Sequence, residues 1–313
     1  MQRARGLAEA SEVKYVCAQR RRCTTQQLRH YTTMEDSAKP AATGGMPEES
    51  DAVGYASSDC YEAIQNQQEE IEKSIKESGP LVSEPLPLDT LKSDFDGHRV
   101  YLEKLEVLNT KYSKIRRVRR DGNCFYRAFG FAYLEYLIEG RRIEEAKRFI
   151  RFCDECKDAL VSFGYIQFTV EDFHEQFVGM VEDLVLNDGQ VSDLEERFNN
   201  QSYSDYYVVF LRLVVSSYMQ RNEEFYANFI SDGKTVKRFC ETEVELMGLS
   251  SDHVHVSALS LAVDVPISIE NCQQSGNLNT LEFPGREGEA AGEKVPAPVV
   301  LLYRPGHYDI LYV

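Results

Sequence analysis

The sequence lacks the features that mark membrane-spanning and nucleic-acid-binding proteins. No apolar run reaches the roughly 20 residues that a helix needs to cross a bilayer. Basic residues are scarce: 35 Lys and Arg face 51 Asp and Glu, and the formal net charge is −16. Since phosphate repulsion would be left unbalanced, this charge argues against a nucleic-acid partner. It also favours, more weakly, a partner with a basic surface.

The cysteines lack the setting of a disulfide-bonded secreted protein. The chain has eight of them, scattered along its length, and the sequence shows no secretory leader. We therefore predict free thiols in a reduced, intracellular setting, with the cytoplasm as the expected location and the nucleus as a second one. The cysteines are Cys17, Cys23, Cys60, Cys124, Cys153, Cys156, Cys240 and Cys272.

Composition along the chain predicts one core and a tail. A hydrophobic fraction of 42% in 313 residues is enough for one sizeable core, which we place in residues 81–313. Residues 1–57 are expected to be disordered, since 34–57 lack periodic apolar positions. Within them, 1–33 are rich in arginine and poor in acids, which is compatible with a mitochondrial presequence. The alternative, which we favour, is a non-native extension upstream of the natural start. Residues 58–80 are predicted to hold a separate helix.

The stretch Asp121–Phe129 (Asp-Gly-Asn-Cys-Phe-Tyr-Arg-Ala-Phe) is the most informative segment. Its apolar residues recur at helical spacing, which predicts a buried helix beginning near Cys124. Asp121 and Asn123 are good N-cap residues, and Gly122 permits a tight turn. A cysteine at a helix N-terminus meets a positive dipole and unpaired N–H groups, and both favour the nucleophilic thiolate.

A candidate base lies near the C-terminus. Val299–Arg304 is predicted to be a buried strand, Pro305-Gly306 a turn, and His307–Tyr312 a second strand. Because alternate strand residues share a face, we expect His307 and Asp309 to point the same way, with Asp309 orienting the imidazole. Cysteine, histidine and an orienting group are the parts of a thiol hydrolase. The alternative is a buried structural cysteine and an ordinary turn histidine.

These two motifs carry a resemblance to a known family. Asp121–Arg127 and Gly306–Asp309 together resemble the ovarian-tumour (OTU) family of deubiquitinating cysteine proteases, and within it the otubain subfamily. The resemblance covers about residues 58–313, with motifs at both ends in the right order. Further otubain-like stretches are Glu171–His174, Ser204–Tyr206, Phe210–Leu213 and Ser251–His253.

The resemblance implies a fold, a reaction and roles for residues. The fold would be α+β and papain-like, with a small central sheet packed between helical subdomains and an OTU catalytic domain over 81–313. Cys124 would be the nucleophile, and His307 the general base and then acid. Asp309 would orient the histidine, and Asp121 would belong to the oxyanion turn. The reaction would be hydrolysis of isopeptide bonds at the C-terminal glycine of ubiquitin, preferring 48-linked chains, with no metal or other cofactor.

The resemblance also implies partners and a second activity. We expect ubiquitin, polyubiquitin chains and ubiquitin-conjugating (E2) enzymes as partners of a monomer. Similar otubains bind charged E2 enzymes and block ubiquitin transfer without the thiol, so a purely non-catalytic inhibitor is the alternative function. The segment matching 58–80 can contact a second ubiquitin, which makes Ile64, Ile71 and Ile75 candidate contacts. The alternative is a solvated helix docked on its own domain.

Three other residues are candidate ubiquitin contacts. Tyr303 and Tyr308 flank the predicted hairpin, and aromatic rings with a polar tip suit a protein-binding surface, although core packing is the alternative. The resemblance places His253 near the ubiquitin-facing surface. His253 and His255 would share a face on a strand, as a metal site requires, but a capped helix, which we favour, separates the two rings.

The remaining segments are mostly predicted to be helical, and some of them have two alternative interpretations. The four arginines between Arg116 and Arg120 either favour the thiolate or form a solvated edge. Val208–Val215 could be a buried strand, but the length of the whole stretch Tyr203–Arg221 favours a core helix. Cys153-Asp-Glu-Cys156 lacks the partners of a zinc or redox site, so we favour a structural role. His174 is expected to face outward, and residues 273–296 to form a long mobile loop.

Overall fold

The computed structural model describes residues 66–67, 70–71, 73–75, 77, 79–230, 233–283, 285 and 297–313. The chain divides into two compact units, Met1–Lys73 and Ser74–Val313. The segment 1–57, predicted to be disordered, and both interpretations of 1–33 lie outside the described residues. In the part that is described, no helix has the length and apolar character needed to cross a membrane.

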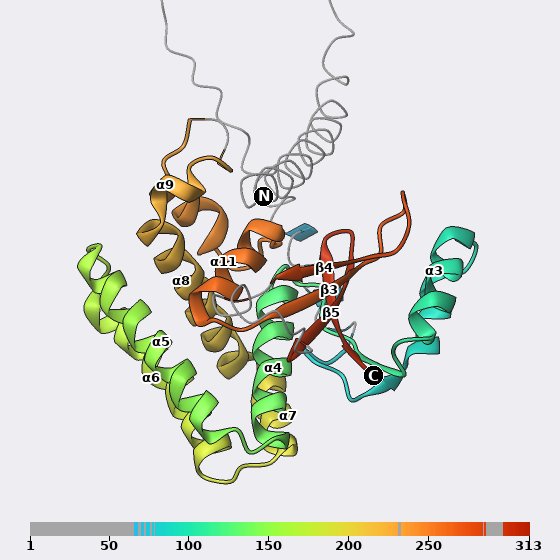
Figure 1. Cartoon of the computed structure of the whole chain (residues 1–313), viewed down its shortest axis with the longest axis horizontal. Coiled ribbons are helices and arrows are strands. Elements are labelled where there is room, and N and C mark those ends of the chain that lie inside the picture. Colours follow the sequence, from blue (N-terminus) through green and yellow to red (C-terminus); the bar gives the residue numbers. More distant parts are fainter. Residues whose placement is uncertain are drawn as a thin grey trace, which may run out of the picture. The chain divides into compact units, whose positions relative to one another are not determined.

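A mixed sheet organises the second unit. Its described strands stand in the order β1-β2-β6-β5-β3-β4, and β3, β4 and β5 are labelled in Figure 1. The strands are β1 (Leu86–Pro87), β2 (Lys114–Arg116), β3 (Ile267–Asn271), β4 (Asn279–Phe283), β5 (Val299–Arg304) and β6 (His307–Tyr312). Neighbours run antiparallel except β3 and β5, which are parallel. This sheet, flanked by helices, confirms the predicted α+β fold.

The β5–β6 hairpin forms where the sequence predicted it. Its register pairs Arg304 with His307 and Leu302 with Asp309. Gly306 in the turn has φ 74°, a left-handed conformation that glycine adopts without a Cβ clash. Residues 307–311 of β6 are all buried, because α4 packs on one face of the strand and the apolar cluster with η1 and α3 covers the other. The polar residues of this strand therefore lie in the protein interior.

Helices surround the sheet. The described helices and short helical turns are η1 (Leu88–Phe95), α3 (Arg99–Asn109), α4 (Cys124–Glu139), α5 (Ile143–Ser162), α6 (Gln167–Val181), η2 (Glu182–Leu186), α7 (Val191–Asn199), α8 (Gln201–Arg221), α9 (Glu223–Tyr226), α10 (Val236–Phe239), η3 (Cys240–Val244) and α11 (His253–Val263). Two predictions are confirmed: a helix begins at Cys124, and Tyr203–Arg221 is helical rather than extended.

The sheet lies between two helical layers (Figure 1). On one side, η1 and α3 share an apolar cluster with strands β2, β5 and β6. On the other side, α4 packs against β5 and β6 and is backed by α7 and α8. Since α4 is covered on nearly all sides, its sequence is apolar around most of its circumference. The buried residues of the first cluster are Leu88, Leu91, Phe95, Leu105, Leu108, Ile115, Cys272, Leu302 and Leu311.

Two segment predictions were wrong. Residues 273–296 do not form only a loop, because Asn279–Phe283 is strand β4, paired with β3 at the sheet edge. Its side chains are exposed or half-buried, so the sequence carries little apolar alternation there. His174 does not face outward: it is buried, its Nε2 lies 2.8 Å from Asp154 Oδ1, and its ring packs against Phe210.

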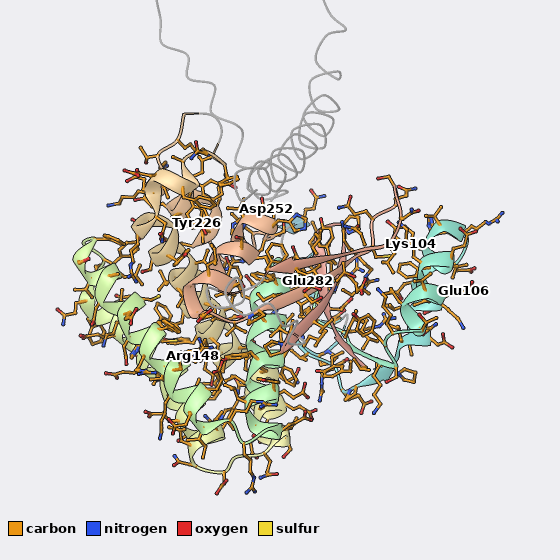
Figure 2. All side chains as sticks on the ribbon, in the orientation of Figure 1. Lys104, Glu106, Arg148, Tyr226, Asp252 and Glu282 are labelled. Atoms are coloured by element: carbon orange, nitrogen blue, oxygen red, sulfur yellow. The ribbon has the colours of Figure 1, made fainter. Side chains whose placement is uncertain are left out.

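Arginine ion pairs connect the helical layer to its neighbours. Arg116 is buried on β2, and its Nη2 lies 2.9 Å from Glu135 Oε1 of α4. It therefore fits neither the solvated edge nor the thiol-activating cation that the sequence suggested. Arg148 of α5, labelled in Figure 2, lies 2.9 Å from Asp264 Oδ2, just after α11. Because an unpaired buried charge is costly, these pairs fix how the elements stack.

The described residues between 66 and 77 are helical, as predicted for this part of 58–80. Ile71 is 47% exposed, and Ile75 is half-buried. Ile64 lies outside the described residues. Ile71 thus offers apolar surface at the place where the sequence suggested a partner-binding face.

Candidate active site

Cys124 is the first residue of α4 and lies in the interior. Its side chain is 2% exposed, and the backbone N–H of Tyr308 on β6 donates a hydrogen bond to its sulfur. Burial raises the pKa of the thiol to about 11, and the Tyr308 N–H and the Arg127 charge offset only part of this effect. The helix N-terminus was expected to favour the thiolate. Burial outweighs this effect, so the thiol is neutral at neutral pH.

His307 and Asp309 project from the same face of β6 and touch. His307 Nε2 lies 2.9 Å from Asp309 Oδ1, and both side chains are buried. Because an ionised carboxylate only accepts, Nε2 carries the proton in this pair, and Nδ1 holds the lone pair. Nδ1 is buried and has no hydrogen-bond partner among the described residues. This nitrogen is therefore free to accept a proton from a nearby donor.

Asp309 is held by more groups than the sequence indicated. Its Oδ1 also accepts from the Val118 N–H at 2.9 Å, and its Oδ2 accepts from Arg304 Nη2 at 2.5 Å. Arg304 in turn pairs with Asp94 of η1 at 3.0 Å. Burial alone would raise the pKa of Asp309, but the hydrogen bond that it accepts from His307 and the positive charge of Arg304 outweigh burial and lower the pKa to about 2. The carboxylate is therefore ionised at every physiological pH.

Asp121 fixes the turn that precedes Cys124. Its Oδ1 accepts from the Asn123 N–H at 2.9 Å. The Arg127 Nη1 donates to Oδ1 at 2.9 Å and to Oδ2 at 2.7 Å, and Arg127 also bonds Ser204 Oγ. Asp121 thus connects the turn to α4 and α8. This geometry matches a residue that holds the turn rather than one that touches a substrate.

Asn123 does not cap α4 with its side chain, contrary to our prediction. Its Oδ1 instead accepts from the Gly248 N–H at 2.9 Å, which joins the turn to the loop after η3. The two glycines at this junction are in close contact, because a Cβ on Gly122 would lie 1.9 Å from the Gly248 carbonyl oxygen. Gly122 has φ 76°, so glycine is required there for conformation and for space.

The candidate ubiquitin contacts near the hairpin differ in how much of each side chain is exposed. Tyr308 is 1% exposed and packs against Phe125, with ring centroids 5.3 Å apart, so the core-packing alternative holds for it. His253 is 9% exposed and lies 5.8 Å from the Tyr303 ring, which leaves it little surface for a partner. Tyr303 is half-buried and keeps an accessible part.

The sequence singled out two other groups of chemistry-bearing residues, the start of α11 and the cysteine pair of α5. His253 begins α11, and the Asp252 side chain, labelled in Figure 2, caps it by accepting from the Val254 N–H. Cys153 and Cys156 are both buried in α5. Within the described ranges, no group of three or more His, Cys, Asp and Glu side chains could hold a metal ion.

The arginines between 116 and 120 divide among several roles. Arg117 Nη2 lies 3.1 Å from Asp94 Oδ1, and Arg119 Nη2 donates to the Gly79 carbonyl at 2.6 Å. Of the four arginines, Arg120 is the one whose charge interacts with the Cys124 thiol. Three of these four cations are therefore used to join segments rather than to activate the thiol.

Sequence reasoning missed Arg304, Asp94 and Arg212. A local pattern could have found Arg304, since it faces His307 across a two-residue turn in the hairpin register. Asp94 and Arg212 are distant in sequence from the residues they contact. Arg212 lies in the otubain-like stretch Phe210–Leu213, but its contacts depend on the packing of α8 against the 121–124 turn.

Comparison with known proteins places the chain in a family. Residues 74–313 match the sequence profile described as Peptidase C65 Otubain. The ubiquitin thioesterase OTUB1 of Homo sapiens is 44% identical over 266 residues, and the match covers 84% of this chain and 94% of that protein.

Solved structures agree with this match. A complex of h/ceOTUB1 with ubiquitin aldehyde and UBCH5B~Ub superposes with a TM-score of 0.73 at 30% identity, covering 81% of this chain and 98% of that chain. A complex of ceOTUB1 with ubiquitin aldehyde and UBC13~Ub gives a TM-score of 0.72 at 30% identity, covering 79% and 98%. The similarity therefore includes nearly the whole of the solved chains.

Proposed function

Because the chain belongs to the otubain family, Peptidase C65, it is a cysteine-type deubiquitinase, and we propose that it hydrolyses isopeptide bonds at the C-terminal glycine of ubiquitin. One observation carries the assignment of residues. Cys124 at the N-terminus of α4 lies against β6, whose residues His307 and Asp309 form a buried hydrogen-bonded pair. A thiol, a base and an orienting carboxylate are the groups this reaction needs.

The first step makes a thioester. His307 Nδ1 takes the thiol proton while Cys124 Sγ bonds to the carbonyl carbon of the glycine, and the C=O electron pair moves to oxygen. Backbone N–H groups of the turn 121–124 stabilise this oxyanion. The N–H of Asn123 is not among them, since Asp121 already accepts it. The C–N bond then breaks, and His307 gives its proton to the leaving lysine amine.

The second step releases ubiquitin. A water molecule attacks the thioester carbonyl, and His307 Nδ1 takes one of its protons. The C–S bond breaks, the proton returns to the Cys124 sulfur, and ubiquitin leaves with a free carboxylate. Asp309 stays ionised throughout and holds Nε2–H, which stabilises the imidazolium in both steps. Because Nδ1 has no hydrogen-bond partner among the described residues, we infer that substrate binding completes its alignment with the thiol.

The related complexes support two kinds of partner. They hold ubiquitin aldehyde together with UBC13~Ub or UBCH5B~Ub. We propose that this chain also binds ubiquitin, polyubiquitin chains with a preference for the 48-linked form, and E2 enzymes charged with ubiquitin. Tyr303 and the exposed Ile71 are retained as candidate contacts, with Ile75 beside the latter. Tyr308 is not retained, because it is buried.

A second function of a different class is inhibition of ubiquitin transfer. The E2 enzymes in the related complexes favour it, since each carries ubiquitin next to an OTUB1 chain. The segment 58–80 distinguishes the two functions, because hydrolysis of a simple ubiquitin ester does not require a second ubiquitin contact. A purely inhibitory protein would keep E2 binding and show no turnover.

The test combines one point variant and one deletion. We would assay linkage-defined diubiquitins, a ubiquitin C-terminal ester and E2-dependent chain formation with wild type, Cys124→Ala and a chain lacking residues 58–78. Cys124→Ala should lose at least about 10³-fold in hydrolysis and still inhibit the E2. The deletion should weaken diubiquitin cleavage and inhibition but leave ester hydrolysis intact. Absence of cleavage by a folded wild type that binds ubiquitin would leave the inhibitor as the function.

A further inference from the structure

Arg212 has no role in the mechanism above, yet it is enclosed beside the active-site turn. It lies in α8 and is 0% exposed. Its Nη1 donates to the Val244 carbonyl at 2.8 Å, and its Nη2 donates to the Leu249 carbonyl at 2.8 Å. One guanidinium group therefore holds both ends of the loop that follows η3.

The same guanidinium reaches the turn before Cys124. Nη2 also contacts the Gly122 carbonyl at 3.1 Å and Asn123 Oδ1 at 2.9 Å. The peptide between Gly122 and Asn123 is thus held at both ends, because its N–H donates to Asp121 Oδ1. A planar trans peptide with both polar groups engaged cannot rotate without breaking one of these bonds. Arg212 and Asp121 together fix the conformation of this peptide, and with it the direction of the other N–H groups of the turn that can reach the oxyanion.

The charge of Arg212 is not neutralised by a neighbouring carboxylate. Among the described residues no Asp or Glu forms an ion pair with it, whereas the buried Arg127 pairs with Asp121 and Arg304 with Asp309. Its acceptors are neutral carbonyls, and its guanidinium lies 4.6 Å from the centroid of the Tyr126 ring. Its contacts with Gly122 and Asn123 place this charge beside the two residues that directly precede Cys124. A cation held in this way stabilises negative charge that develops nearby.

The loop that Arg212 holds also forms a wall of the site. Gly248 is in contact with the turn, since a Cβ on Gly122 would meet its carbonyl. Its neighbours Leu246 and Met247 are exposed, so this loop connects the turn to the protein surface. Movement of the loop would be transmitted to the turn through Arg212 and Asn123.

We propose that Arg212 is a positioning residue for the hydrolysis: it locks the Gly122–Asn123 peptide against the loop 245–249 and supplies an unpaired positive charge beside Cys124. This inference rests on the proposed hydrolase function. The two contributions separate chemically. Locking needs the forked guanidinium, which reaches several acceptors at once, while the charge needs only a cation. Lysine at this position keeps the charge and loses the fork, and methionine loses both.

The experiment uses the full chain with Arg212→Lys, Arg212→Met and the control Arg148→Lys. Arg148 bonds Glu145 and Asp264 and touches no residue of the turn. For each protein we would measure kcat and KM on a ubiquitin C-terminal ester, the rate at which iodoacetamide alkylates Cys124 by peptide mass spectrometry, and the thermal midpoint. Alkylation needs no ubiquitin, so it reports on the turn even where hydrolysis is absent.

We expect kcat and alkylation to respond differently. Arg212→Lys should lower kcat about 10- to 100-fold with KM within about twofold, since oxyanion groups act in the transition state. Its alkylation rate should stay within about threefold of wild type, whereas Arg212→Met should be about tenfold slower, as a rise of one unit in the thiol pKa predicts. Arg148→Lys should change neither.

Several results would overturn the proposal. One is an Arg212→Lys enzyme with the kcat of the Arg148→Lys control, and another is a loss carried by KM rather than kcat. Equal alkylation of Cys124 in wild type and Arg212→Met would refute the role of the charge. If Arg212→Met does not fold, the lysine variant still decides the locking role. If wild type turns over no ubiquitin ester, the hydrolase function fails, and the alkylation rates still test Arg212.

Discussion

The two halves of the active site are built in different ways. The base half lies within one hairpin: His307 and Asp309 are two residues apart and 2.9 Å from each other, and the pKa of Asp309 is lowered to about 2. The nucleophile half is assembled from α4, α8 and the loop after η3, and burial raises the pKa of Cys124 to about 11.

The difference indicates which half reaches its reactive protonation state only when the substrate is bound. The carboxylate of Asp309 is already charged and hydrogen-bonded before ubiquitin arrives. The thiol is neutral, and its hydrogen bond comes from the Tyr308 N–H rather than from His307. Formation of the thiolate therefore belongs to the bound state, in which His307 Nδ1 takes the proton.

The largest effect is expected at the base half, the His307–Asp309 pair. Asp309→Asn keeps the shape but presents His307 with an amide, which favours the wrong tautomer, and it removes one of the two carboxylates that pair with Arg304. We expect kcat on a ubiquitin ester to fall about 10²- to 10⁴-fold, with little change in KM. Asp94→Asn is the matched control, since Asp94 also pairs with Arg304 but does not contact His307. Equal losses in both variants would contradict the assignment.

The turns of the two halves can be compared by adding one methyl group to each, through a glycine-to-alanine substitution. Gly122 and Gly306 have φ 76° and 74°, but a Cβ on Gly122 would meet Gly248, while one on Gly306 has nothing within 4 Å. Gly306→Ala should lower the free energy of unfolding by about 1 kcal/mol, the cost of a left-handed alanine. Gly122→Ala should lower it by about 3 kcal/mol or more, because backbone must also move. Urea unfolding would measure both, and similar losses would argue against the close contact.

The smallest effect is a pH dependence of stability. The pKa of Asp309 in the folded protein, about 2, lies below the value of an unfolded aspartate, about 3.9. Asp309 therefore contributes roughly 2 to 3 kcal/mol of stability that is present above about pH 4 and is lost as the pH falls toward 2. The difference in unfolding free energy between wild type and Asp309→Asn should shrink over that range. A constant difference would show that the carboxylate is not stabilised as described.

The base half of the active site was easier to predict from sequence than the nucleophile half. Strand alternation places His307 and Asp309 on one face, and Pro305-Gly306 indicates the turn between the strands. The start of α4 at Cys124 also followed from local spacing and turn residues. These features depend on residues within a few positions of each other, which is the range that periodicity covers.

The other half depends on contacts between distant segments. The side chain of Asn123 was predicted to cap its helix, but it binds Gly248 and Arg212 instead. The burial of Tyr308 and the raised pKa of Cys124 follow from the packing of α4 on β6, which no local pattern reveals. Strand β4 was missed because an edge strand with polar side chains shows little alternation. Burial is decided by how elements stack, and the sequence pattern reports only one element at a time.

One measurement tests the central assignment most directly. Ubiquitin carrying a thiol-reactive group at its C-terminus would be incubated with wild type and with Cys124→Ser, and the intact masses compared. We predict a single ubiquitin adduct on wild type and none on the variant, which would establish Cys124 as the thiol that meets the C-terminus of ubiquitin. An adduct that persists on Cys124→Ser, or none on a folded wild type that binds ubiquitin, would contradict the account.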